Sequence, residues 1–292
     1  MIDTGSLLQI LFWGLYAGCI YILLAAGVNL IFGVMKTVNF AHGELLMIGA
    51  YVTWTLLSLS GLNPYLLLAV TVPVLFLLGV AVERLAFRPV LGSHKLNEIF
   101  LSIGLIYLFQ NAVAMLWGDD YQTIRSPFES IAFSIGSFRL PLDYLIIIGV
   151  TVAILVGLQL LLRRTRLGLA LRATSQNRKA AMLSGIDVER MDMLAFGLGA
   201  GLAGAAGTLW AVSGQVFDPY MGSVPAIKAF AIVILGGLGS IPGAIIGGLF
   251  YGLAESAATY TLGGAWKDAI SFVVLIVVLI IRPTGIFGER GE

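Results

Sequence analysis

The sequence has little charge and almost no cysteine for its length. Only 11% of its 292 residues are Asp, Glu, Lys or Arg, whereas 59% are hydrophobic. So few charged side chains cannot cover the surface of a water-soluble globule, and the composition therefore excludes a soluble enzyme. The single cysteine, Cys19, excludes an intramolecular disulfide and a cysteine metal cluster. The net charge of +1 lacks the basic excess that a nucleic-acid partner requires.

The sequence also lacks a basic leader and a nucleotide-binding motif. No Lys or Arg precedes Lys36, so the first apolar block, residues 7–31, has no basic n-region and is too long for a cleavable signal. We expect it to stay as the first membrane span. The glycine-rich segment 235–244 has no Lys followed by Ser or Thr, which a Walker A loop needs. We therefore expect no nucleotide site and no cofactor.

The chain does contain a series of long apolar blocks. Blocks of about 16 to 25 residues can cross roughly 30 Å of hydrocarbon as helices. They predict an all-α fold, a polytopic transmembrane helical bundle made by one domain, residues 1–292. The candidate spans are residues 8–31, 44–60, 65–87, 98–117, 142–162, 192–213, 226–239, 243–260 and 267–281. The segments 226–239 and 267–281 are short enough to be half-helices, so we expect eight or nine spans, some of them broken or short.

The distribution of basic residues predicts the orientation in the bilayer. If the segment 163–190 is cytoplasmic, alternating spans leave only four of the 17 Lys and Arg outside: Arg125, Arg139, Lys228 and Lys267. The positive-inside rule favours this arrangement over its inverse. We therefore expect the N-terminus outside and the C-terminus in the cytoplasm.

Small residues recur four positions apart in three of the predicted spans. The residues are Gly14 and Gly18, then Gly197 and Gly201, then Ala244, Gly248 and Gly252. Such patterns let helices approach closely. They favour packing inside the bundle, with a subunit interface as the second interpretation.

Two glycine-bounded joints, residues 33–44 and 235–244, interrupt the apolar pattern. Polar groups near the membrane are costly and suggest a function, and broken helices expose backbone groups to a cavity. For the first joint an ordinary turn, in which Asn39 caps the next helix, is an equal alternative. His42 and Glu44 alone are too few ligands for a metal site. We predict that both joints approach a translocation path from the cytoplasmic side; the candidate residues are Asn39, His42, Glu44, Gly236, Gly237, Gly239 and Pro242.

The longest polar run on the cytoplasmic side is residues 163–190. Regularly placed Leu, Ala and Met residues make it amphipathic, which predicts short helices that end at Gly185. Such a segment either lies on the membrane surface or docks on a partner protein.

Two charged residues, Lys228 and Glu255, lie inside predicted spans away from their ends. They are 13 residues before and 14 residues after Ile241, near the middle of the turn, so an antiparallel hairpin brings both to a similar depth. Pairing would reduce the cost of burying either charge. The alternative is that Lys228 snorkels outward while Glu255 lines an aqueous vestibule.

At five segments the sequence resembles the inner-membrane permeases of branched-chain amino acid ABC importers, and the resemblance covers essentially the whole chain. The segments are residues 38–44 (VNFAHGE), 83–90 (ERLAFRPV), 168–185, 236–243 (GGLGSIPG) and 282–288 (RPTGIFG). The resemblance implies a transport subunit of the bacterial inner membrane that hydrolyses nothing itself. Its implied partners are a second permease, two cytoplasmic ATPases and a periplasmic binding protein.

Permeases of ABC importers often carry a coupling helix marked Glu-Ala-Ala-x-x-x-Gly. The matching positions here are Lys179, Ala180, Ala181 and Gly185, with Lys in place of the acid. These residues are the candidate contacts to an ATPase.

Two other functions are alternatives, and the sequence alone separates the first of them poorly from amino acid import. Urea permeases resemble the same family, so urea or a short amide is an alternative cargo. A secondary transporter or channel that works alone would need ionisable residues in mid-membrane for ion coupling, and only Lys228 and Glu255 fit that description.

Overall fold

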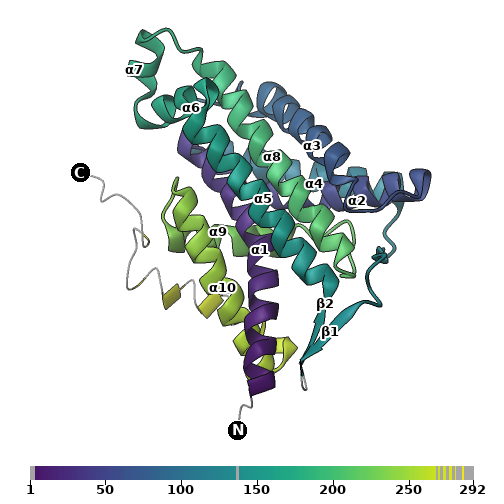
Figure 1. The fold of residues 1–292 in the computed structure, drawn as a ribbon. Coiled ribbons are helices and arrows are strands. Elements are labelled where there is room, and N and C mark those ends of the chain that lie inside the picture. Colours follow the sequence, from purple (N-terminus) through teal and green to yellow (C-terminus); the bar gives the residue numbers. More distant parts are fainter. Residues whose placement is uncertain are drawn as a thin grey trace.

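The computed structural model describes residues 4–135 and 138–267, together with positions 269, 272, 273, 276, 277, 280 and 285. Within these residues the chain forms ten α-helices and one β-hairpin, which confirms the predicted helical bundle (Figure 1). The helices are α1 (Thr4–Met35), α2 (His42–Ser60), α3 (Leu68–Val82), α4 (Lys95–Trp117), α5 (Leu142–Arg164), α6 (Arg166–Gln176), α7 (Arg178–Leu183), α8 (Val188–Val212), α9 (Ser223–Gly236) and α10 (Ile241–Leu262). A π-helical turn, Glu83–Phe87, extends α3, and the strands β1 (Ala132–Ile135) and β2 (Phe138–Pro141) pair antiparallel.

Seven of the described helices are long and apolar enough to cross a membrane: α1, α2, α3 with its π-helical turn, α4, α5, α8 and α10. The seventh predicted block, residues 226–239, corresponds to α9, which has only 14 residues. At 1.5 Å per residue, α9 spans about 21 Å, less than the hydrocarbon thickness. The ninth predicted block, residues 267–281, lies partly outside the described residues.

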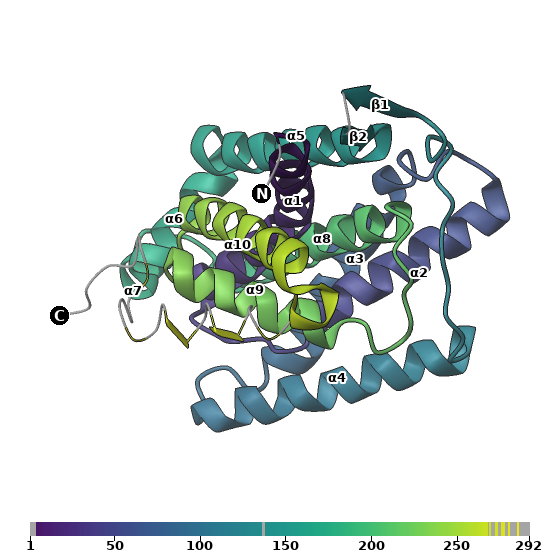
Figure 2. The ribbon, with the colours of Figure 1, turned by 90° about the horizontal axis from the view of Figure 1, so that it is seen from below.

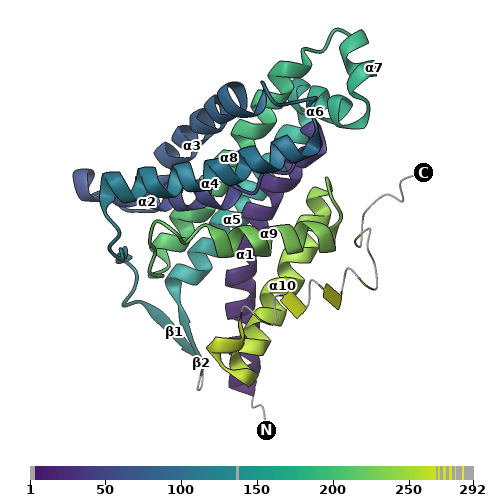
Figure 3. The same ribbon diagram turned by 180° about the vertical axis from the view of Figure 1, so that it is seen from behind.

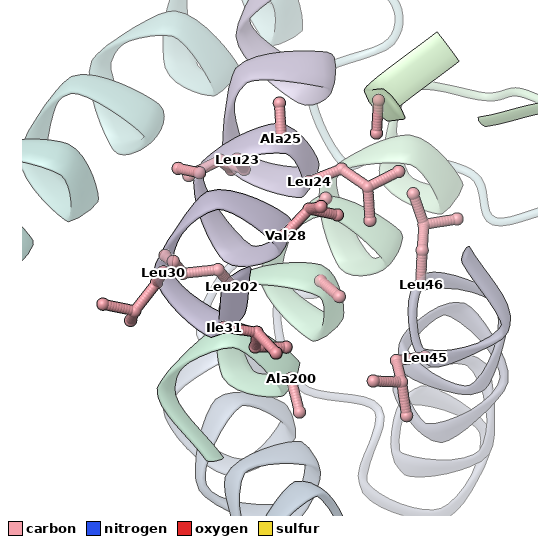
Figure 4. Close-up of a cluster of buried hydrophobic side chains, with 14 of the residues drawn as sticks. Leu23, Leu24, Ala25, Val28, Leu30, Ile31, Leu45, Leu46, Ala200 and Leu202 are labelled. Carbon is pink, nitrogen blue, oxygen red and sulfur yellow. The ribbon is translucent and has the colours of Figure 1, made fainter. Parts of the chain in front are cut away.

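The helices α1 and α8 form the centre of the bundle. In the view along α1, α4 lies at one edge and α5 at the opposite edge, with α8, α9 and α10 between them (Figure 2). Leu24 and Ile31 of α1, Leu46 of α2 and Ala200 of α8 meet in one buried apolar cluster (Figure 4). The apolar residues of α3, α4 and α5 are exposed far more often, so these helices form the outer layer.

The small-residue patterns lie at close helix contacts inside the bundle. A methyl group at Gly18 would come within 2.9 Å of the carbonyl oxygen of Gly248, so α1 and α10 touch backbone to backbone. A methyl group at Gly197 of α8 would lie 2.9 Å from the Phe76 ring of α3. The interpretation as internal packing is therefore confirmed for these contacts.

The segments between the helices gather at two opposite ends of the molecule. The N-terminus and the hairpin β1–β2 lie at one end, and α6 and α7 lie at the other (Figures 1 and 3). At the hairpin end, the Tyr65 hydroxyl donates to Asp143 Oδ1 at 2.6 Å, and Ser126 donates to the same oxygen. These bonds tie two loops to the start of α5: the loop between α2 and α3 and the loop before β1.

Candidate translocation and coupling sites

The second glycine-bounded joint is tied to α1 by one side chain. Asn29 of α1 is fully buried, and its Oδ1 accepts a hydrogen bond from the Gly239 N–H at 2.9 Å. Its Nδ2 donates to the Ser240 carbonyl oxygen, also at 2.9 Å. Gly237 and Gly239 have φ values of 100° and 83°, which glycine adopts without strain. Asn29 therefore pairs the Gly239 N–H and adds a second hydrogen bond to the Ser240 carbonyl, which also accepts from the Ala244 N–H at 2.9 Å.

The same joint fixes the start of α10. Ser240 Oγ accepts a hydrogen bond from the Gly243 N–H at 3.1 Å and so caps the helix. Pro242 lies in the first turn, where its missing N–H costs nothing. Gly236 and Gly237 are buried, whereas Gly239 and Pro242 are exposed.

The first joint is more deeply buried: Asn39, His42 and Glu44 are each at most 4% exposed. Asn39 does not cap α2, because the N-cap residue is Ala41. Its Oδ1 instead accepts from the Ala41 N–H at 3.0 Å, which closes a turn just before the helix. The alternative in which Asn39 caps α2 is therefore wrong by two residues, although the side chain does stabilise the turn.

His42 and Glu44 face different helices. The His42 ring packs against α1, since a methyl group at Gly27 would lie 2.7 Å from Nε2. Glu44 Oε1 accepts hydrogen bonds from Gln110 Nε2 of α4 at 3.0 Å and from Ser223 Oγ of α9 at 3.5 Å. Glu44 therefore joins α2, α4 and α9 in the interior of the bundle.

Both joints contact the same stretch of α1, residues 28–34, but from different sides. A small space on one side is lined by Val28, Ile31, Thr37, Asn39 and His42. An open groove of about 80 Å³ on the other side is lined by residues that include Asn29, Gly33, Gly239, Arg172 and Ser175. The second joint and α6 therefore border one groove.

The charged residues Lys228 and Glu255 lie side by side. Lys228 Nζ is 3.2 Å from Glu255 Oε1, and both side chains are at most 5% exposed. The Tyr21 hydroxyl lies 3.2 Å from the same oxygen and 3.3 Å from Lys228 Nζ. Lys267 Nζ approaches Glu255 Oε1 at 3.0 Å. The carboxylate thus binds two ammonium groups, and the contribution of Lys267 did not follow from the spacing in the sequence.

The polar segment 163–190 contains two short helices, α6 and α7, as its amphipathic pattern predicted. It breaks at Asn177, whose Oδ1 accepts from the Ala180 N–H at 3.0 Å and caps α7. Gly185 follows α7 with φ 81°, at the predicted end of the helical segment. Lys179 and Ala180 are exposed, but Ala181 is only 3% exposed and faces the protein itself.

The exposed apolar side chains of this segment lie elsewhere. Leu183 is 89% exposed and Met182 is 61% exposed. Both follow directly on Ala181 in α7. The spacing pattern drew attention to Ala181, whereas the structure presents Met182 and Leu183 on the outer surface.

Comparison with known proteins identifies the family. Residues 10–279 match the family described as branched-chain amino acid transport system / permease component. The chain is 37% identical over 294 residues to the high-affinity branched-chain amino acid transport system permease protein BraD of Pseudomonas aeruginosa, covering 97% of this chain and 96% of BraD. It is 36% identical over 299 residues to LivH of Escherichia coli K12, with the same coverage. The chain belongs to this family.

A more distant relative is a second kind of permease from the same type of system. The high-affinity branched-chain amino acid transport system permease protein LivM of Salmonella typhimurium is 27% identical over 288 residues, covering 91% of this chain and 67% of LivM. The family identification confirms the resemblance that the five motif segments indicated.

Within the permease fold, two of those segments meet each other and a third contacts α8. Residue Gly285 of the segment 282–288 has φ 78°, and a methyl group there would lie 2.7 Å from the Gly237 nitrogen of the second joint. Arg88, from the segment 83–90, forms ion pairs with Glu83 at 3.3 Å and with Glu189 of α8 at 3.2 Å. The motifs therefore mark contacts between distant parts of the permease.

The link between Asn29 and the second joint can be tested by mutation. Asn29→Ala leaves the Gly239 N–H and the Ser240 carbonyl without this partner, so we expect the free energy of unfolding to fall by about 1 to 3 kcal/mol. The measurement is thermal or denaturant-induced unfolding of the purified permease in detergent.

The matched control is Ser240→Ala at the same joint. It removes only the cap of α10 and keeps the main-chain carbonyl that Asn29 binds, so we expect a loss of about 1 kcal/mol. Equal stability of the Asn29→Ala variant and the parent would show that the joint does not depend on α1.

Proposed function

We propose that this chain is the transmembrane permease subunit of a binding-protein-dependent ABC importer for branched-chain amino acids. The observation that carries the proposal is the match to branched-chain amino acid permeases over 97% of the chain, which leaves no large segment for a different activity. The names of the relatives favour aliphatic amino acids over urea or a short amide.

In this proposal the residues 28–34 of α1 and the two joints border the path that the amino acid takes. The candidate residues are Asn39, His42, Glu44, Gly236, Gly237, Gly239 and Pro242. Support comes from the groove beside Asn29 and Gly239 and from the short helix α9, because a broken helix can change its angle without unfolding a full span. The apolar residues Leu30 and Val34 in this groove suit an aliphatic side chain that must pass without being held.

ATP hydrolysis is assigned to separate cytoplasmic subunits that dock on α7. Leu183 and Met182 are exposed on a helix beyond the ends of the spans, and Lys179 and Ala180 are exposed beside them. An apolar surface of this kind on the water side is typical of a protein interface. Two ATPases, a periplasmic binding protein and a second permease complete the machine, and the similarity to LivM favours a different chain as that second permease.

The experiment that tests this function is purification from native membranes followed by uptake measurement. We expect ATPase subunits to co-purify with the permease and leucine uptake to require ATP. Unlabelled isoleucine and valine should compete with labelled leucine, and urea or acetamide should not. Purification without any ATPase would contradict the importer, whereas competition by urea would change only the cargo.

The orientation can be tested by labelling single cysteines, in a background where the buried Cys19 is replaced by Ala. Ser184 follows α7 and Ser60 ends α2 at the opposite side of the predicted topology, and both are exposed. We expect a membrane-impermeant maleimide to label Ser60→Cys in intact spheroplasts and Ser184→Cys only after permeabilisation, because the basic segment faces the cytoplasm. The reverse pattern would invert the topology.

A further inference from the structure

The position of α7 depends on contacts with the rest of the permease. The helix has six residues, too few to be stable as an isolated helix in water. Its first residue, Arg178, forms a two-pronged ion pair with Asp192 of α8: Nη1 donates to Oδ1 at 2.9 Å, and Nη2 donates to Oδ2. A bidentate pair fixes both distance and direction. The ion pair therefore holds α7 in a defined orientation on α8.

The acidic partner, Asp192, is buried near the start of α8. The Asp192 side chain is 2% exposed, one turn inside α8, whereas the Arg178 side chain is 42% exposed. A buried carboxylate that lost this partner would keep only the longer-range attraction of Arg88. A displacement of α7 therefore either carries Asp192 and α8 with it or breaks a costly contact.

From Asp192 the contacts continue to the second joint. The helix α8 packs against α1, where a methyl group at Gly199 would lie 2.9 Å from the Gly27 carbonyl oxygen. Further along α1, Asn29 binds Gly239 and Ser240. Packed helices and paired side chains thus form one continuous connection from α7 to the break between α9 and α10. Such a connection can carry energetic coupling.

We propose that the ion pair of Arg178 and Asp192 is the positioning contact that transmits ATPase-driven movement of α7 to the transmembrane helices. This inference rests on the proposed importer function, and it deepens that function by naming the link. Neither residue touches the amino acid or ATP; they act by holding α7 to α8.

The test uses the purified complex in proteoliposomes and measures leucine moved per ATP hydrolysed. In Asp192→Asn we expect the ATPases still to co-purify and to hydrolyse ATP, while the ratio falls about tenfold, within the range of mutations along coupling networks. Arg178→Lys, which keeps the charge but loses the two-pronged geometry, should give an intermediate ratio. The exchanged pair, Arg178→Asp with Asp192→Arg, should restore much of it.

The matched control is Glu98→Gln on α4. Glu98 is likewise a buried carboxylate, 4% exposed, paired at 3.1 Å with an exposed base, Lys95, whose Nζ also donates to the Lys36 carbonyl rather than to a residue of α7. We expect the Glu98→Gln complex to move as much leucine per ATP hydrolysed as the parent complex. This control separates loss of a buried charge from loss of the link.

Three results would overturn the inference. The first is a parental ratio in Asp192→Asn. The second is a smaller amount of assembled complex in which the leucine moved per ATP hydrolysed is unchanged, because the ion pair would then have only a structural role. If Asp192→Asn does not fold, a parental ratio in Arg178→Lys is the third. Absence of ATPase from the parent complex would instead contradict the proposed function.

Discussion

Leu183→Glu is expected to abolish ATP-dependent uptake while the permease still folds and inserts. Leu183 is 89% exposed, so the change removes no buried packing within the chain. In the proposed complex, however, the side chain lies under an ATPase, where an added charge would be desolvated without a partner. Substitution of a central interface residue can weaken the binding free energy by 2 kcal/mol or more, which is about a 30-fold loss of affinity. The measurement is co-purification of the ATPases together with leucine uptake.

The control for this variant is Leu62→Glu. Leu62 is 53% exposed in the loop between α2 and α3, at the end of the molecule predicted to face outward. The chemical change is identical, but we expect ATPase association to be unaffected. If Leu183→Glu retains its ATPases and its uptake, α7 is not the docking surface.

The second large effect is expected at Glu255. Glu255→Leu takes away the carboxylate that Lys228 Nζ approaches at 3.2 Å and Lys267 Nζ at 3.0 Å. Removing one partner from a buried ion pair typically costs about 3 to 5 kcal/mol, because a buried charge is left behind. Lys228→Met should cost less, since Lys267 stays beside the carboxylate. Unfolding of the purified permease in detergent measures both.

The double variant separates the interaction from packing. With Lys228→Met and Glu255→Leu together, the buried charges are replaced by apolar side chains of similar size, and we expect most of the lost stability to return. Lys267→Gln serves as the control on the same carboxylate, because this lysine is 40% exposed and should contribute at most about 1 kcal/mol. Additive losses in the double variant would mean that Lys228 and Glu255 do not stabilise each other.

Local patterns in the sequence were sufficient to predict the spans and part of the site. Apolar blocks show which segments become helices, and eight of them correspond to described helices. Lys228 and Glu255 are almost equally far from Ile241 in the sequence, and one tight turn joins their two helices. This spacing predicted that the two residues lie at a similar depth in an antiparallel hairpin. The contact of Lys267 with Glu255 could not be predicted from this spacing, because α10 ends at Leu262 and the chain turns back through Gly264–Trp266.

Contacts between distant segments could not be predicted from one sequence. Asn29 and Gly239 are 210 residues apart, and nothing in the pattern of α1 distinguishes this asparagine from a tolerated polar residue. The ion pair of Arg178 with Asp192 depends on how α7 folds back onto α8. The same is true of Ala181, whose burial is decided by the helix it faces rather than by its own segment.

The central claim is that this permease imports branched-chain amino acids with energy from ATP hydrolysed by its partners. The most direct test is leucine uptake into proteoliposomes that contain the complex purified from native membranes, with ATP enclosed and the binding protein added outside. We predict that leucine accumulates against its gradient with ATP, and does not do so with a non-hydrolysable analogue. Accumulation without ATP, driven by an ion gradient through this chain alone, would contradict the account.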